Sequence, residues 1–214
     1  MRFIPILALL STVYANPIKR ATIRRGNTIA ASDITQIDPL TSSCANAPAA
    51  GECRTAAQAA PYVAISFTNF GIMSFGEQAA IVALMLYETG GFKYAQNHYP
   101  GVPGQGTRNM QSPAYNLKYA EWLATICLNC GMSSSEVQTA QAQGPAAVLD
   151  LVNSDEWSFG SAAWFLATQC DSSVRQALAT GSQEGWESYL QCVGASDDAD
   201  RDALWNKAIA LKAW

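Results

Sequence analysis

The amino-acid sequence predicts a mainly α-helical domain, and three observations support this. Apolar residues recur near the 3.6-residue helical period, as in Ala203, Leu204, Ala208 and Leu211. Helix-start signals precede several of these stretches, and the alternating pattern of half-buried strands is nearly absent. Once the first 25 residues are set aside, about 190 residues remain, which suits one domain with a sizeable core.

The first elements follow from local composition. Residues 26–53 are small and polar and are expected to be loop-like, ending near Cys53. Residues 55–70 carry apolar side chains at helical spacing and predict a helix. Pro61 lies within it and lacks a backbone donor, so a break or kink is expected there.

The next helix is the most apolar of the chain. Ser74-Phe75-Gly76-Glu77 has the form of a capping box, which predicts a helix start at Phe75. The helix is expected to continue to about Tyr87, and Gly90-Gly91 to end it. Residues 89–112 then show no helical period and are rich in glycine and proline, so we expect a short β-hairpin or a long glycine-rich loop.

The second half of the chain predicts only helices. Ser112-Pro113 reads as an N-cap followed by a first-turn proline, opening a helix with Tyr115, Tyr119 and Trp122 on it. Apolar spacing predicts further helices at residues 133–142, 145–152, 159–170, 172–179, 183–191 and 197–212.

The N-terminal end has the features of a secretory leader. Residues 1–15 predict a signal peptide, with a basic start, an apolar run and a small-x-small cleavage site. Residues 16–25 contain two dibasic pairs and predict a propeptide, so residues 26–214 would form the domain of a secreted, extracellular protein. No later stretch has about 18 consecutive apolar residues, so no transmembrane helix is expected.

Removal of residues 1–25 leaves 8 basic and 17 acidic residues, a net charge of −9. This balance argues against nucleic acid or an anionic membrane as a partner, because both require basic patches. The chain is expected to be a monomer.

Six cysteines in a secreted chain favour disulfides over free thiols. Proximity in the sequence favours the pairs Cys44–Cys53, Cys127–Cys130 and Cys170–Cys192. The spacing of Cys127 and Cys130 also fits a redox or zinc motif, but the chain has one histidine and no suitable strand-helix context. No metal and no cofactor are therefore predicted.

Glu88 is the candidate catalytic residue. It follows an unbroken apolar run, and Ile81, Leu84 and Met85 share its helical face, which would carry the carboxyl against the core. Loss of water favours the protonated form of a carboxyl, and so does the negative end of the helix dipole. A protonated acid is what glycoside cleavage needs to protonate a leaving oxygen.

Three motifs in this order resemble the lysozyme-like superfamily, above all plant-type chitinases and secreted fungal muramidases. Glu88-Thr89-Gly90-Gly91-Phe92 is similar to the motif that carries the general acid of plant-type chitinases. Residues 104–116, with Met110-Gln111 and Tyr115-Asn116, resemble their glycine-rich hairpin and the turn of goose-type lysozymes. Residues 157–166 resemble a chitinase core helix.

The resemblance implies a glycosidase in which Glu88 protonates the glycosidic oxygen. It also implies that Gln111 and Asn116 bind an N-acetyl group and that Thr89 positions the carboxyl or a water. Tyr94, His98 and Tyr115 join the candidate substrate-binding residues, and Arg108 is a candidate to contact a carboxylate of peptidoglycan.

One departure from the family concerns the second carboxylate. Plant-type chitinases carry a general base about two dozen residues after the acid, whereas this chain has no Asp or Glu between Glu88 and Glu121. Goose-type lysozymes work with one essential glutamate, and this favours peptidoglycan over chitin as the polysaccharide substrate.

Three functions are therefore weighed. The first is a muramidase or lysozyme, with a chitinase as the closest variant. The second is a non-catalytic secreted glycan-binding or effector protein that keeps the fold, and the third is a cysteine peptidase or amidase that uses a thiol and His98.

Overall fold

The structure, a computed structural model, describes residues 28–126 and 132–214. The predicted signal peptide and propeptide, and the Cys127–Cys130 pair, lie outside the described residues. Within them the fold is mainly α-helical, which confirms the predicted class, and no strand is formed. The helices are α1 (Ala31–Ile37), η1 (Pro39–Ser42), α2 (Ala56–Asn69), α3 (Phe75–Glu88), α4 (Pro113–Ile126), α5 (Ser134–Gln143), α6 (Pro145–Val152), α7 (Asp155–Thr168), α8 (Ser172–Ala179), α9 (Gln183–Val193) and α10 (Ala199–Ile209).

Two of the sequence expectations about these elements are wrong. The segment before Cys53 is not simply loop, because it contains α1 and the short 3-10 helix η1. Helix α2 runs through Pro61 without a break. A proline in this position forfeits one backbone hydrogen bond, but tertiary packing of the buried face of α2 holds the helix together.

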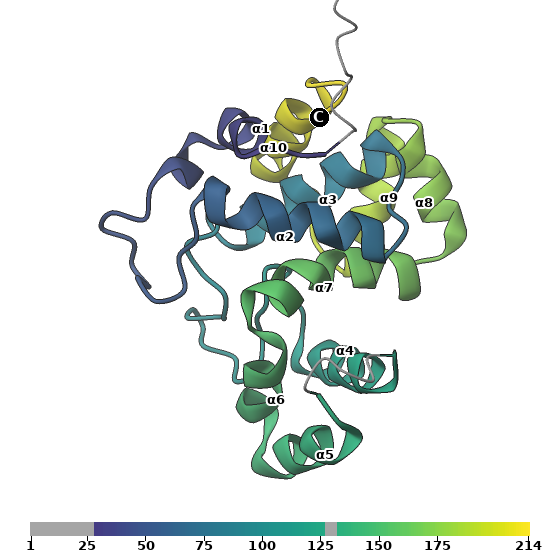
Figure 1. The fold of residues 1–214 in the computed structure, drawn as a ribbon. Coiled ribbons are helices and arrows are strands. Elements are labelled where there is room, and N and C mark those ends of the chain that lie inside the picture. The colour runs from purple at the N-terminus through teal and green to yellow at the C-terminus, as the bar shows by residue number, and fades with distance from the viewer. Residues whose placement is uncertain (1–27, 127–131) are drawn as a thin grey trace, which may run out of the picture.

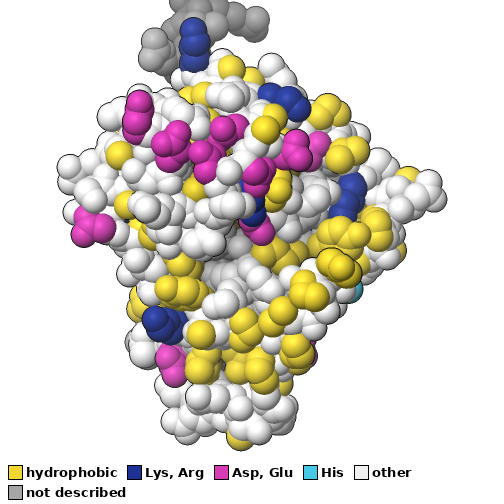
Figure 2. Space-filling model, turned by 180° about the vertical axis from the view of Figure 1, so that it is seen from behind, with side chains coloured by type: hydrophobic (Ala, Val, Ile, Leu, Met, Phe, Trp, Pro, Cys, Tyr) yellow, Lys and Arg dark blue, Asp and Glu magenta, His cyan; other side chains and the backbone are white. Residues whose placement is uncertain are grey.

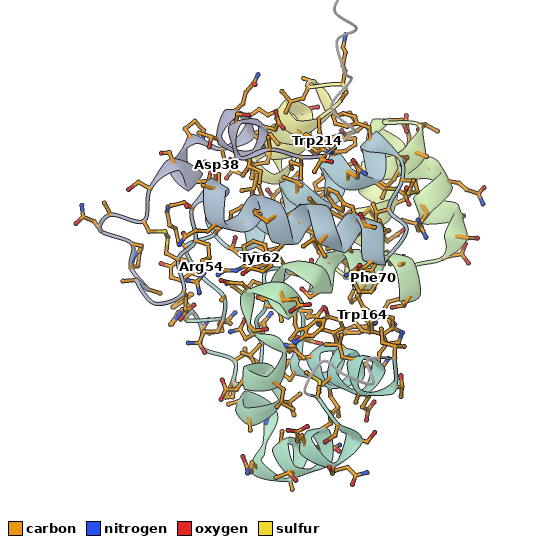
Figure 3. The ribbon with its side chains drawn as sticks, in the orientation of Figure 1. Asp38, Arg54, Tyr62, Phe70, Trp164 and Trp214 are labelled. Carbon is orange, nitrogen blue, oxygen red and sulfur yellow. A yellow bond between two sulfur atoms is a disulfide. The ribbon has the colours of Figure 1, made fainter. Side chains whose placement is uncertain are left out.

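The helices form two packed groups that share α7 (Figure 1). The upper group contains α1, α2, α3 and α8 to α10, and the lower group contains α4, α5 and α6. Phe159 and Leu166 of α7 belong to the core of the upper group, whereas Trp164 and Phe165 belong to that of the lower group. Phe70 packs against both cores and lies near Trp164 in Figure 3.

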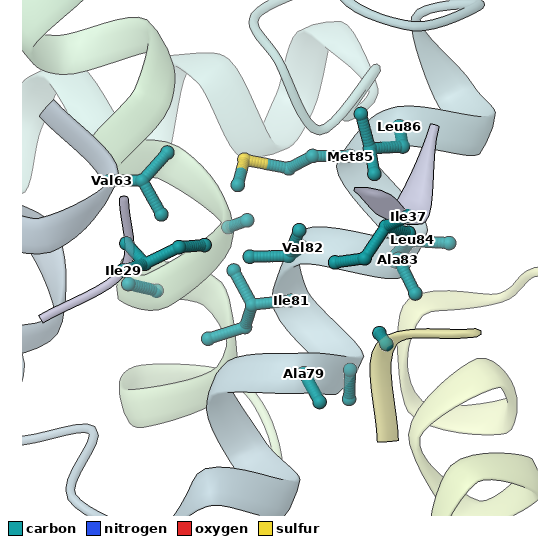
Figure 4. Packing of buried hydrophobic residues seen from close by; sticks show 14 of the residues in the cluster. Ile29, Ile37, Val63, Ala79, Ile81, Val82, Ala83, Leu84, Met85 and Leu86 are labelled. Carbon is teal, nitrogen blue, oxygen red and sulfur yellow. The ribbon is translucent and has the colours of Figure 1, made fainter. Parts of the chain in front are cut away.

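Helix α3 is the central element of the upper group. The backbone N–H of Glu77 donates to Ser74 Oγ at 3.2 Å, and the backbone N–H of Ser74 donates to the Glu77 carboxylate at 3.1 Å, so the predicted capping box is present. Every residue from Gly76 to Leu86 is buried. Figure 4 shows its apolar side chains, Val82 and Met85 among them, packed between neighbouring helices. An apolar helix without a polar face is expected to be surrounded in this way.

The predicted glycine-rich segment between α3 and α4 is a long loop. Two isolated bridges, between Gln96 and Gly106 and between Gly106 and Gln111, are its only sheet-like pairing among the described residues. Gly90 and Gly91 adopt positive φ of 57° and 72° directly after α3, so the expected glycine ending is present.

Two predicted disulfides are confirmed. Cys44 pairs with Cys53, and Cys170 pairs with Cys192, which ties the segment after α7 to α9. No described cysteine is free. A thiol nucleophile is therefore absent from the part of the chain that the structure describes.

Among the described residues, helices of the length and apolarity needed to span a bilayer are not found.

Candidate functional site

A polar groove lies where the two groups of helices meet. It has a volume of about 310 Å³ and is walled by the C-terminal half of α3, the loop after it, the start of α4, the segment between α9 and α10, and α10 itself. Phe165 of α7, the helix common to both groups, also lines it. We call this feature the α3–α10 groove, and its lining residues are Leu84, Glu88, Gln105, Asn109, Met110, Gln111, Ser112, Tyr115, Phe165, Val193, Gly194, Ala195 and Arg201.

Glu88 is the last residue of α3 and faces this groove. Arg201 Nη2 donates to Glu88 Oε1 at 2.8 Å, and the two side chains are 12% and 22% exposed. Arg201 also pairs with Asp198, and its guanidinium lies 4.0 Å from the centre of the Tyr87 ring. The Glu88 carboxyl is therefore held in an ion pair, rather than lying against apolar core as its place on the helix had suggested.

Gln111 is held in place by an amide network. Asn116 is fully buried, and its Nδ2 donates to the backbone carbonyls of Gly104 at 2.8 Å and Gln111 at 3.3 Å. Its Oδ1 is therefore the acceptor that takes the Gln111 Nε2 donor at 2.8 Å. This arrangement fixes the orientation of the Gln111 amide and leaves its buried Oε1 without a hydrogen-bond partner among the described residues.

Three of the buried polar atoms without a hydrogen-bond partner belong to residues that line this groove. They are Asn109 Oδ1, Gln111 Oε1 and Arg201 Nε. Asn109 is 7% exposed and Gln111 is 5% exposed, so neither side chain is solvated as a surface amide would be. A buried polar atom without a partner carries a desolvation cost that a bound ligand or an ordered water relieves.

The backbone around Asn109 is strained. Thr107 and Met110 adopt positive φ of 63° and 43°, a region that residues other than glycine rarely adopt. The Thr107 hydroxyl donates to the Gly106 carbonyl at 2.6 Å and accepts from Ser161 at 2.9 Å, which holds the turn in place. Backbone strain of this kind is concentrated at functional sites. Together with the unpartnered Asn109 Oδ1, the strained turn therefore indicates that this loop has a functional role.

Thr89 does not reach the groove. It is fully buried, its hydroxyl donates to the Met85 carbonyl at 2.6 Å, and the hydroxyl oxygen accepts from the Phe92 backbone N–H at 2.9 Å. These bonds make Thr89 the C-cap of α3. The expected role of its hydroxyl in positioning a carboxyl or a water is therefore wrong.

Tyr94 and His98 also lie away from the groove, in the loop beside Glu52. His98 is exposed, its Nε2 lies 2.7 Å from Glu52 Oε1, and its ring packs against Tyr94 with centres 5.4 Å apart. Burial works against the charge of Glu52, but hydrogen bonds from Ala95, Gln96 and His98 outweigh it and lower the pKa of Glu52. This cluster anchors the loop to the segment closed by the Cys44–Cys53 disulfide.

Arg108 is a structural residue, so its predicted contact with a ligand carboxylate is wrong. Its side chain is 1% exposed and donates to three backbone carbonyls: Phe92 at 3.1 Å, Tyr94 at 2.8 Å and Glu52 at 2.6 Å. Burial lowers the pKa of Arg108 to about 10, although the nearby Asp155 carboxylate opposes this shift.

Of the seven predicted site residues, Glu88, Gln111 and Tyr115 line the groove, and Asn116 supports Gln111 from behind. Sequence reasoning missed Asn109, Gln105, Ser112 and Arg201. Asn109 and Ser112 flank the Met110-Gln111 turn, so proximity along the chain could have suggested them. Arg201 is 113 residues from Glu88, and no local pattern links the two.

A second cavity of about 290 Å³ lies between α2, α4 and α7. Its lining is mainly apolar and includes Tyr62, Phe70, Trp122 and Trp157. Trp122 and Trp157 therefore both border this apolar cavity rather than the polar groove.

No group of three His, Cys, Asp or Glu side chains that could hold a metal ion is found within residues 28–126 and 132–214. Glu121, Asp150, Asp155 and Glu156, which could have supplied a general base, are absent from the groove lining, and Asp155 is paired with Arg54 at 2.6 Å.

Comparison with known proteins overturns the expected family. No family model matches the chain, and no solved structure matches it. Over 139 residues, 64% of this chain, it is 47% identical to a protein of Fusarium oxysporum (strain Fo5176) named bifunctional dioxygenase (DOX)-epoxy alcohol synthase (EAS). The chain spans 11% of the length of that relative.

The lysozyme-like resemblance and the glycosidase activity that it implied are therefore wrong, for muramidase and chitinase alike. The relative carries the name of an oxidative enzyme, and no lysozyme-like family is found. The physical reason is that the three motifs are short and that the predicted activity depended mainly on one residue, Glu88. In the structure Glu88 is paired with Arg201.

Proposed function

We propose that this chain is a ligand-binding domain whose α3–α10 groove takes a polar ligand that donates hydrogen bonds. The observation that carries the proposal is the pair of unpartnered side-chain oxygens, Asn109 Oδ1 and Gln111 Oε1, in one groove. Both are acceptors, so the ligand groups that fit them are hydroxyl or N–H donors. Glu88 and Tyr115 are the further proposed contacts, with Asn116 as the positioning residue for Gln111.

A saccharide supports this chemistry well, because each ring presents several hydroxyl donors at close spacing. The proposed ligand is therefore a segment of polysaccharide, and the proposal concerns binding and not bond cleavage. The two activities in the name of the Fusarium relative belong to that protein, and a segment spanning 11% of its length assigns neither of them to this chain.

We further propose that the protein is secreted and acts as a monomer, with residues 26–214 as the binding domain. The Cys44–Cys53 and Cys170–Cys192 disulfides support an oxidising compartment. The excess of acidic side chains supports a ligand other than nucleic acid or an anionic membrane.

Isothermal titration calorimetry with hexamers of glucose, N-acetylglucosamine and glucosamine tests the proposal on the protein. The informative variant is Asn109→Ala, because Asn109 Oδ1 has no hydrogen-bond partner among the described residues whose loss would weaken the fold. One lost hydrogen bond to the ligand should weaken binding by about threefold to tenfold. Gln141→Ala on α5, an exposed amide distant in the fold, is the matched control and should leave binding unchanged.

Two outcomes would contradict the proposal. The first is the absence of measurable heat with all three hexamers at millimolar concentration. The second is binding that Asn109→Ala and Gln141→Ala leave equally intact, since the ligand would then sit outside the groove.

A further inference from the structure

A row of carboxylates follows the groove wall along the chain. Ala195 lines the groove, and Asp197, Asp198, Asp200 and Asp202 come directly after it, at the start of α10. Figure 2 shows Asp and Glu side chains gathered in a band across the upper part of the face that it displays, beside a hollow. Asp197 and Asp200 are exposed, and the Asp197 carboxyl lies within hydrogen-bonding reach of Asp202.

The net charge around this row of carboxylates is negative even though Arg201 lies among them. Arg201 is paired with both Glu88 and Asp198, so these three side chains together carry one negative charge. Asp197, Asp200 and Asp202 add three more. Desolvation raises the pKa of Asp197, and so do the charge of Asp202, a hydrogen bond with the Asp202 carboxyl and the charge of Asp198.

Acidic side chains on a surface are usually solvated and do not by themselves indicate a ligand. The independent evidence for a ligand comes from the groove. Gln111 is 5% exposed and lines the same cavity as Glu88, and its buried Oε1 has no hydrogen-bond partner among the described residues. Asn109 Oδ1 is a second such acceptor. Arg201 donates to Glu88 Oε1, and Glu88 Oε2 accepts no hydrogen bond from the part of the chain that the structure describes. The site thus offers acceptors and negative charge together.

We infer that the ligand of the α3–α10 groove carries protonated amines beside its hydroxyl groups, as an oligomer of an amino sugar does. The inference rests on the proposed function and names the class of ligand for that site. The hydroxyl groups satisfy the amide oxygens of Asn109 and Gln111, and the ammonium groups face Glu88 and the carboxylates that open α10.

The expected preference follows from Coulomb's law in water. A carboxylate about 7 Å from an ammonium favours binding by about threefold at low salt, and two such carboxylates by about tenfold. Ionic strength of 0.3 M screens charges that are exposed and several ångströms apart, so most of this preference should disappear there.

The test is calorimetric titration of the protein with the glucosamine hexamer and the N-acetylglucosamine hexamer, at 0.03 M and 0.3 M salt and pH 6. We expect the glucosamine hexamer to bind about tenfold more tightly at low salt and nearly equally at high salt. The double variant Asp197→Asn with Asp200→Asn should reduce the preference to about threefold or less. It should leave N-acetylglucosamine binding unchanged, because neither side chain lines the groove.

The control is the double variant Glu121→Gln with Asp150→Asn, which removes two exposed carboxylates from α4 and α6 in the lower group. It should keep the full preference. Circular dichroism of each variant verifies that the fold is retained.

The outcomes separate the two proposals. If the N-acetylglucosamine hexamer binds and the glucosamine hexamer binds no more tightly, the amine preference is wrong while the groove remains a binding site. If spermidine binds as tightly as the glucosamine hexamer, the hydroxyl groups are not needed and the inference is also wrong. If no hexamer binds, the proposed function itself fails.

Discussion

The buried position of Arg108 leads to a prediction about stability that the structure allows to be worked out. The change is Arg108→Met, which keeps most of the apolar volume and removes the guanidinium. Three hydrogen bonds to the carbonyls of Phe92, Tyr94 and Glu52 are lost. At about 1.5–3 kcal/mol for each bond to a charged group, the loss is about 4–9 kcal/mol.

The variant also gains stability, because it no longer buries a charged group. Lowering the pKa of Arg108 from 12.5 to about 10 corresponds to about 3 kcal/mol against the charged form. The net loss in the free energy of unfolding is therefore about 1–6 kcal/mol, with about 3 kcal/mol as the expected value. This is a large share of the roughly 5–15 kcal/mol that stabilises a typical domain.

Reversible urea unfolding followed by circular dichroism measures this loss. Lys207→Met, which removes an exposed cation from α10, is the control and should change stability by less than about 0.5 kcal/mol. Arg108→Lys should not restore the native value, because one ammonium cannot reproduce the geometry of the guanidinium. If Arg108→Met costs no more than Lys207→Met, the three contacts do not anchor the loop and the reasoning is refuted.

Three further predictions follow from named contacts. Glu52→Gln should lower the free energy of unfolding by about 1 kcal/mol at pH 7. Because the pKa of Glu52 lies below its ordinary value of 4.5, this difference should persist above pH 4.5 and vanish as the pH falls further. Urea titrations across pH 3–7 measure it. Gly106→Ala should cost about 1–3 kcal/mol in the same assay, because the new Cβ would lie 2.7 Å from the Ala95 carbonyl oxygen. Arg201→Met should lower the thermal midpoint by an amount equivalent to about 1–3 kcal/mol, since it leaves Glu88 without its cation, and a midpoint equal to that of the native protein would contradict the pairing.

Much of the helical framework was predictable because its signals are local. The capping box at Ser74 and the first-turn proline at Pro113 mark helix starts that the structure has at those positions. The Cys44–Cys53 and Cys170–Cys192 pairs join residues 9 and 22 positions apart, so proximity was a sound guide. The same local reasoning failed at Pro61, where packing outweighs one lost hydrogen bond.

The site was predictable only in part. Gln111 and Asn116 are close in sequence, and their amides do meet. The partners of Glu88 and Arg108 come from distant segments, so the sequence alone could not show that one carboxyl is paired or that one guanidinium is buried. The family prediction failed for a related reason, since short motifs fix a local conformation without fixing what surrounds it.

The contact between α3 and α10 has a consequence for how the protein matures. Helix α10 packs on α3 and covers part of its apolar surface, and it also supplies Arg201 to the groove. On the ribosome, α3 therefore emerges more than a hundred residues before the helix that shields it. A chain truncated ahead of residue 199 would lose Arg201 from the groove and expose apolar surface of α3 at the same time.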